Sequence, residues 1–62
     1  MTEQEKKMLE ELKGSLIEIY LAVNDKCYCG TLLDYDSECL IIEKDGKQKL
    51  FYKKNISHIN GM

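Results

Sequence analysis

The stretch that decides the fold lies near the end of the chain and reads Gly46-Lys47-Gln48-Lys49-Leu50-Phe51-Tyr52-Lys53-Lys54-Asn55-Ile56-Ser57-His58-Ile59. An apolar and aromatic strand runs directly into two lysines and an asparagine, and a second short strand follows. Two strands joined this tightly place Lys53 and Lys54 at one exposed corner of a sheet. That corner becomes a strong positive centre if several copies of the chain bring it together.

The chain has 62 residues, which is near the lower limit for a domain that folds alone. We therefore expect a single domain over residues 1–62 that is stabilised by self-association. The hydrophobic fraction of 44% argues against disorder, and no apolar run approaches the ~18 residues of a membrane span. The charged start of the chain predicts no secretory signal, and the odd number of cysteines, three, indicates reduced thiols in the cytoplasm.

The net charge of −2 counts against a nucleic-acid-binding protein, because such domains are usually basic overall. The distribution of charge points the other way. Acidic residues crowd the first third of the chain, whereas four of the nine lysines lie between Lys47 and Lys54. A ligand that meets one face responds to the local potential rather than to the sum.

A short amphipathic helix is predicted over about residues 2–13. Thr2 and Glu5 have the spacing of a capping box, and Gly14 is a suitable stop. The apolar stripe of this helix consists of Met8, Leu9 and Leu12. Because so short a helix is unstable in water, it must pack on the rest of the chain.

From Leu16 onward the apolar pattern alternates with a period of two, which predicts strands. Polar turns and the hairpin signal Asp45-Gly46 divide this region into five short strands. We expect these strands at residues 16–23, 27–34, 39–43, 48–53 and 56–59. A helix followed by five strongly bent antiparallel strands predicts a mainly β fold, a small barrel of the SH3 type over about residues 15–60.

Helix plus five strands is also the plan of the Sm-like fold, and several motifs resemble the Hfq branch of it, the bacterial Sm-like RNA chaperones. The similarity runs over roughly residues 4–59 and is closest to members from Gram-positive bacteria. The motifs that carry it are Ile17-Glu18-Ile19-Tyr20-Leu21, Tyr35-Asp36, Gly46-Lys47-Gln48 and Tyr52-Lys53-x-x-Ile56-Ser57.

The Hfq family forms homohexameric rings that bind single-stranded RNA on both faces and help small RNAs pair with messages. By this resemblance, RNA rich in U is bound near the pore, on the proximal face, by Lys53, Lys54, Gln4 and Ser37. RNA rich in A is bound on the distal face by Tyr20, Lys26, Tyr28 and Thr31. The subunit interface is made by edge-to-edge pairing of the fourth and fifth strands, with Tyr52, Phe51 and Ile56 as its residues.

The chain departs from the family pattern in several places, which suggests a divergent paralogue. Lys54 follows Lys53 where histidine is usual, and Glu38 occupies the position of an aromatic ring that stacks on uracil. Losing that ring removes about 1–3 kcal/mol of stacking per base, and a carboxylate repels phosphate. The loop around Asp25 is one residue longer than usual, and Lys13 is the only clear basic candidate on the outer rim.

Simpler interpretations remain open for the same residues. Lys53 and Lys54 could form a solvated turn, and Tyr20, Tyr28 and Tyr35 could serve sheet packing. A rival function is a protein-interaction module with weak or no RNA binding, either monomeric or in a mixed ring. Glu38 and the acidic balance favour this rival.

We expect no metal, no cofactor and no catalysis. A zinc site built from Cys27, Cys29, Cys39 and His58 is disfavoured, because cysteines two apart on a strand have Cα atoms ~6.6 Å apart. Zinc sites draw such cysteines more often from a tight turn. His58 with Ser57 lacks the nucleophile elbow of a hydrolase.

Overall fold

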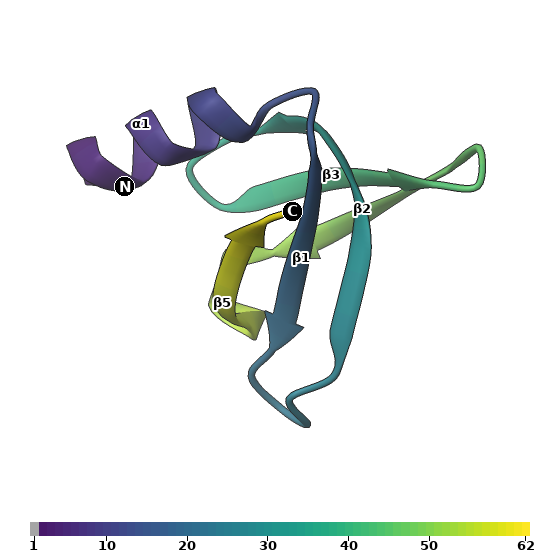
Figure 1. The fold of residues 1–62 in the computed structure, drawn as a ribbon. Coiled ribbons are helices and arrows are strands. Elements are labelled where there is room, and N and C mark those ends of the chain that lie inside the picture. Colours follow the sequence, from purple (N-terminus) through teal and green to yellow (C-terminus); the bar gives the residue numbers. More distant parts are fainter. Residues whose placement is uncertain (1) are drawn as a thin grey trace.

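The computed structural model describes residues 2–62 and shows one helix followed by five antiparallel strands in a single strongly bent sheet (Figure 1). The strand order is β4-β3-β2-β1-β5, so β4 and β5 form the two edges of the sheet. This architecture confirms the predicted mainly β fold with an N-terminal helix. The elements are α1 (Glu3–Leu12), β1 (Leu16–Leu21), β2 (Cys27–Tyr35), β3 (Cys39–Lys44), β4 (Lys47–Tyr52), the 3-10 turn η1 (Lys53–Asn55) and β5 (Ile56–Gly61).

The helix α1 begins and ends where the sequence predicts. The Oγ1 atom of Thr2 accepts a hydrogen bond of 3.1 Å from the backbone N–H of Glu5, and Gly14 adopts φ +85° after the last turn. The hydroxyl of Tyr35 donates to a carboxylate oxygen of Glu10, which ties the helix to β2 and raises the pKa of Tyr35. In the described part of the chain, no helix is both long and apolar enough to cross a membrane.

The core is small and comes from the helix and three adjacent strands. Its fully buried side chains are Leu9, Ile17, Ile19, Leu32, Leu40 and Ile42. The alternation of buried and solvent-facing positions along β1 and β3 produces this set, because successive side chains point to opposite faces of a strand. Helix α1 lies across one end of the sheet, where Leu9 closes the core (Figure 1).

Gly30 allows β2 and β3 to approach each other closely. A Cβ atom at Gly30 would lie 2.4 Å from Cγ2 of Ile42 and 2.8 Å from the carbonyl oxygen of Glu43. Only glycine permits this approach between β2 and β3. The β2–β3 register also shifts by one residue between Leu32 and Asp34, and such a bulge increases the local twist.

Two of the predicted strand boundaries are wrong by two residues, and the others agree to within one residue. The first strand ends at Leu21, because the chain turns at Ala22 and the side chain of Val23 is 87% exposed rather than part of the apolar face. The last strand continues beyond Ile59 to Gly61, because its residues pair with β1 as far as Ile17. The apolar pattern alone could not show this pairing, since the added residues are an asparagine and a glycine.

Candidate nucleic-acid interface

The lysine corner lies at η1, which connects the two edge strands β4 and β5. The backbone N–H of Lys53 donates to the carbonyl oxygen of Glu38 at 2.8 Å, so the β2–β3 turn is held against the corner. That turn is fixed by Asp36, whose Oδ1 atom accepts from the N–H groups of Glu38 (2.8 Å) and Cys39 (2.7 Å). These two bonds lower the pKa of Asp36. The turn and the corner are thus joined by hydrogen bonds from backbone N–H groups.

One small cleft brings together three of the four residues predicted for the pore face. It is lined by Ser37, Glu38, Tyr52, Lys53 and Lys54. The Nζ atom of Lys54 lies 6.0 Å from the centre of the Tyr52 ring, within cation–π range. Glu38 is exposed and shares this cleft with both lysines, so the acidic departure noted in the sequence lies directly beside the basic pair.

The Lys53 side chain is drawn toward the helix. Its Nζ atom lies 3.1 Å from Oε1 of Glu5, and the side chain is only 15% exposed. A second groove, between α1 and β5, runs along this ion pair and also includes Met8 and Ile56. Lys53 therefore lines both hollows. Any anion that binds its ammonium group must either displace the Glu5 carboxylate or bind the ammonium group beside it.

Gln4 does not reach either hollow that Lys53 lines. It lies on the exposed side of α1, where it borders a shallow depression with residues of the helix itself. The helix residue that contacts Lys53 is Glu5, whereas the sequence predicted that Gln4 would lie at the same site as Lys53. The sequence signalled Glu5 only as a capping residue, because a contact between the helix and η1 leaves no periodic trace.

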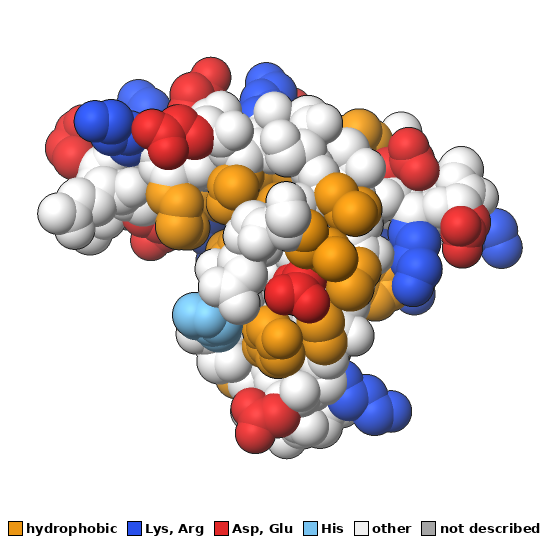
Figure 2. Space-filling model, viewed as in Figure 1, with side chains coloured by type: hydrophobic (Ala, Val, Ile, Leu, Met, Phe, Trp, Pro, Cys, Tyr) orange, Lys and Arg blue, Asp and Glu red, His pale blue; other side chains and the backbone are white. Residues whose placement is uncertain are grey.

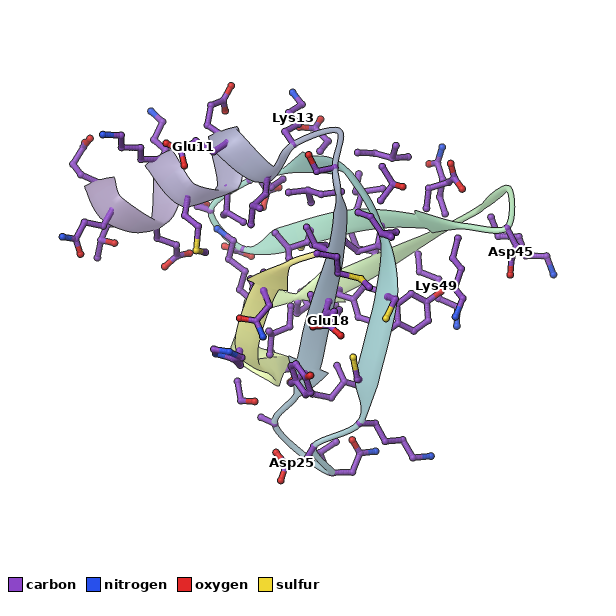
Figure 3. All side chains as sticks on the ribbon, in the orientation of Figure 1. Glu11, Lys13, Glu18, Asp25, Asp45 and Lys49 are labelled. Carbon is purple, nitrogen blue, oxygen red and sulfur yellow. The ribbon has the colours of Figure 1, made fainter. Side chains whose placement is uncertain are left out.

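The run of lysines that the sequence shows as one cluster is divided by the structure. Lys47 and Lys49 lie near the β3–β4 hairpin, where Figure 3 labels Lys49 and Asp45, whereas Lys53 and Lys54 follow the other end of β4. The Nζ atoms of Lys44 and Lys49 lie 5.2 Å and 5.3 Å from the centre of the Tyr28 ring. The potential at the corner comes from two lysines, not four.

The residues predicted for the distal face are also divided. Tyr20 pairs with Cys27 across the β1–β2 ladder, and Thr31 pairs with Leu16, so Tyr20 and Thr31 share the outer face of the sheet. Tyr28 pairs with the buried Ile19 and therefore points to the opposite face.

Tyr28 packs on the inner side of the sheet, with its ring centre 4.9 Å from that of Phe51. Tyr28 therefore lies on the other side of the sheet from Tyr20, because successive strand residues alternate between faces. Lys26 lies exposed in the β1–β2 turn, and its N–H group donates to Oδ1 of Asn24 at 3.0 Å. Of the predicted distal set, only Tyr20 and Thr31 share a sheet face.

The outer face around Tyr20 combines apolar area with one acid. Figure 2 shows hydrophobic side chains gathered around an acidic one on this face, and Figure 3 labels Glu18 there. The Tyr20 ring lies 5.8 Å from that of His58 on β5. The Cys27 side chain and the nearby Glu18 carboxylate raise the pKa of Tyr20.

The residues predicted for the subunit interface lie on the two edge strands. Tyr52 is 47% exposed on β4, Phe51 is half-buried beside it, and Ile56 opens β5. Leu50 is 54% exposed on the same edge. Leu50, Phe51 and Tyr52 make the β4 edge apolar, and Ile56 lies on the opposite edge strand β5. An apolar edge favours pairing with another strand.

No protein-family model matches the chain, and no curated protein matches it in sequence. Among solved structures, it is similar to a 1.55 Å crystal structure described as the pleiotropic translational regulator Hfq. The TM-score is 0.85, with 27% sequence identity, and the match covers 92% of this chain and 97% of the other. The chain therefore has the Hfq-like Sm fold, as its motifs predict.

Proposed function

We propose that this chain is an Hfq-like RNA-binding protein that works as a cytoplasmic RNA chaperone. It assembles into a homohexameric ring, binds single-stranded RNA rich in A or U, and promotes pairing of small RNAs with messages during stress. Its action is non-covalent: lysines hold phosphates, aromatic rings stack on bases, and the ring raises the local concentration of two RNAs. The likeness to a translational regulator over almost the whole chain supports this proposal.

The observation that carries the proposal is the position of Lys53 and Lys54 between two edge strands. If β4 of one copy pairs with β5 of the next, every corner lies beside a subunit boundary and the corners repeat around the ring. Clustered ammonium groups repel one another, and an RNA backbone offsets that repulsion. Tyr52, Phe51 and Ile56 supply the apolar contact of the same boundary.

A second candidate function rests on the two carboxylates beside Lys53. Glu5 already neutralises its ammonium group at 3.1 Å, and Glu38 lies in the cleft where RNA would enter. A protein-interaction module, monomeric or in a mixed ring, is consistent with a corner where carboxylates of the same chain offset the positive charge. The two functions differ in their dependence on salt, because phosphate binding weakens steeply as salt rises.

RNA titration with matched double variants tests the proposal. Fluorescence anisotropy with labelled U-rich and A-rich oligonucleotides is measured at several salt concentrations for the wild type, Lys53→Ala/Lys54→Ala and Lys47→Ala/Lys49→Ala. The second pair changes the charge equally at the opposite end of β4. We expect the corner variant alone to lose U-rich affinity, and its slope of log affinity against log salt to fall by about 0.7 for each lost phosphate contact. Equal effects of the two pairs would contradict the assignment of the corner.

Light scattering over a range of protein and salt concentrations tests the ring separately. A stable species near six times 7.2 kDa supports it. A monomer at every concentration favours the interaction module, because sites shared between subunits could not form.

A further inference from the structure

Three metal-binding side chains meet on the outer face of the sheet, away from the lysine corner. The Sγ atom of Cys27 lies 3.9 Å from Sγ of Cys29 and 3.8 Å from Oε2 of Glu18. One ligand atom from each of the three residues lies within 4.8 Å of the others. No other group of this kind occurs among residues 2–62.

The ladder between β1 and β2 explains this cluster. Cys27 and Cys29 are two apart on β2 and therefore share a face, and Glu18 is the cross-strand partner of Cys29. The Cα spacing of ~6.6 Å was the reason to expect no metal site at these two cysteines. Their sulfur atoms are closer, at 3.9 Å, because the two side chains lean toward each other. Glu18 could not be linked to the cysteines before the register was known.

The distances suit a tetrahedral ion. Zinc–sulfur bonds of about 2.3 Å at the tetrahedral angle hold two sulfur atoms about 3.8 Å apart, and a zinc–oxygen bond of about 2.0 Å places sulfur and oxygen about 3.5 Å apart. The observed separations of 3.9 Å and 3.8 Å are close to both values. Small rotations of exposed or half-buried side chains would complete the geometry.

We propose that Glu18, Cys27 and Cys29 bind a zinc-type divalent cation, with the fourth coordination position open to solvent. Two thiolates favour zinc over magnesium or calcium, which prefer oxygen ligands. On binding, each thiol releases its proton to solvent, and a lone pair of the resulting thiolate sulfur coordinates the ion. This site is independent of the RNA corner, because none of its ligands lines either hollow beside Lys53.

Tyr20 supports the site as an outer-shell residue. It is the cross-strand partner of Cys27, so its ring lies on the same face of the sheet as the proposed ligands. A hydroxyl donor to a ligating thiolate orients the sulfur and stabilises its charge. Cys39 and His58 do not belong to the group, so Cys39 serves as the matched control thiol.

Cobalt(II), a coloured substitute for zinc, tests the proposal on the reduced full-length protein. The wild type should bind one cobalt ion per chain with a thiolate charge-transfer band and the intense visible bands of tetrahedral cobalt, and added zinc should abolish both. Cys27→Ser/Cys29→Ser should lose the bands, Cys39→Ser should keep them, and Glu18→Gln should keep the sulfur band with at least ten-fold weaker binding. Far-UV circular dichroism checks that each variant is folded.

Several results would overturn the site. These are weak octahedral bands in the wild type, an unchanged spectrum in the double variant, and an equal loss of binding in Cys39→Ser. Should the double variant fail to fold, Glu18→Gln decides, because unchanged cobalt affinity in that variant removes the carboxylate ligand from the proposal.

Discussion

Replacing Glu38 by an aromatic residue should convert the cleft at the lysine corner into a stronger site for U-rich RNA. Glu38 is exposed and lines this cleft with Lys53 and Lys54. Its links to the fold are made by the backbone, to Asp36 and Lys53, so Glu38→Phe leaves them in place.

Two effects add in this variant and can be separated. Removing a carboxylate about 4 Å from a phosphate relieves about 1 kcal/mol in water, which is roughly a five-fold gain in affinity that shrinks as salt rises. A ring that stacks on one base adds about 1–3 kcal/mol, or roughly 5- to 150-fold, and this gain persists at high salt. Glu38→Gln therefore reports the charge effect alone, and the difference between Glu38→Phe and Glu38→Gln reports stacking.

The assay is fluorescence anisotropy with labelled oligo(U) at 50 and 200 mM salt. Glu11→Phe, on the exposed side of the helix (Figure 3), controls for non-specific adhesion of an added ring. If Glu38→Phe binds oligo(U) no more tightly than Glu38→Gln at both salt concentrations, the residue does not face the base, and the proposed role of the cleft is wrong. An equal gain in Glu11→Phe would refute it as well.

Three further predictions concern the fold and the outer face. Gly30→Ala should destabilise the protein by about 1–3 kcal/mol in chemical denaturation, because its new Cβ atom would meet Ile42 and the backbone of Glu43 at 2.4 Å and 2.8 Å. Asp36 has a lowered pKa in the folded state, so its stabilisation is present above the unfolded pKa of about 4 and is lost as pH falls through the folded value. Denaturation curves between pH 2 and 7 should accordingly show less loss of stability on acidification for Asp36→Asn than for the wild type. Tyr20→Ala should weaken oligo(A) binding and leave oligo(U) binding unchanged, and equal anisotropy titrations with oligo(A) would remove Tyr20 from the RNA site.

The fold could be predicted from local signals because each element carries its own. The capping hydroxyl of Thr2, the glycine stop at Gly14 and the Asp45-Gly46 hairpin all act within a few residues. Both Asp45 and Gly46 have positive φ, as such a hairpin requires. The errors occur where contacts with other parts of the chain determine the end of a strand. Val23 continues the apolar alternation but lies in an exposed turn, next to Ala22, whose N–H group donates to the carbonyl oxygen of Asn55.

The site was harder to predict because its geometry depends on contacts between distant segments. The resemblance to the Hfq family assigned Lys53, Lys54 and Ser37 to one face, and in the structure all three line one cleft. It could not show that Glu5 faces Lys53, since forty-eight positions separate them and no pattern links them. Alternation along the strand separates Tyr28 from Thr31, but only the register of β1 against β2 shows which of them shares a face with Tyr20.

The carboxylates beside Lys53 make assembly a condition of RNA binding if the proposed function holds. RNA must compete with Glu5 for the ammonium group and must approach past Glu38, so a single corner offers little affinity. Linked sites compensate for weak individual ones, because each binding event raises the effective concentration of RNA at the next. In the monomer, the two edge strands have unpaired backbone groups and apolar side chains, and the core contains six fully buried hydrophobic side chains among residues 2–62. If the proposed ring forms, assembly and RNA binding both depend on the boundary between β4 of one copy and β5 of the next, so a variant that cannot close this boundary should lose both together.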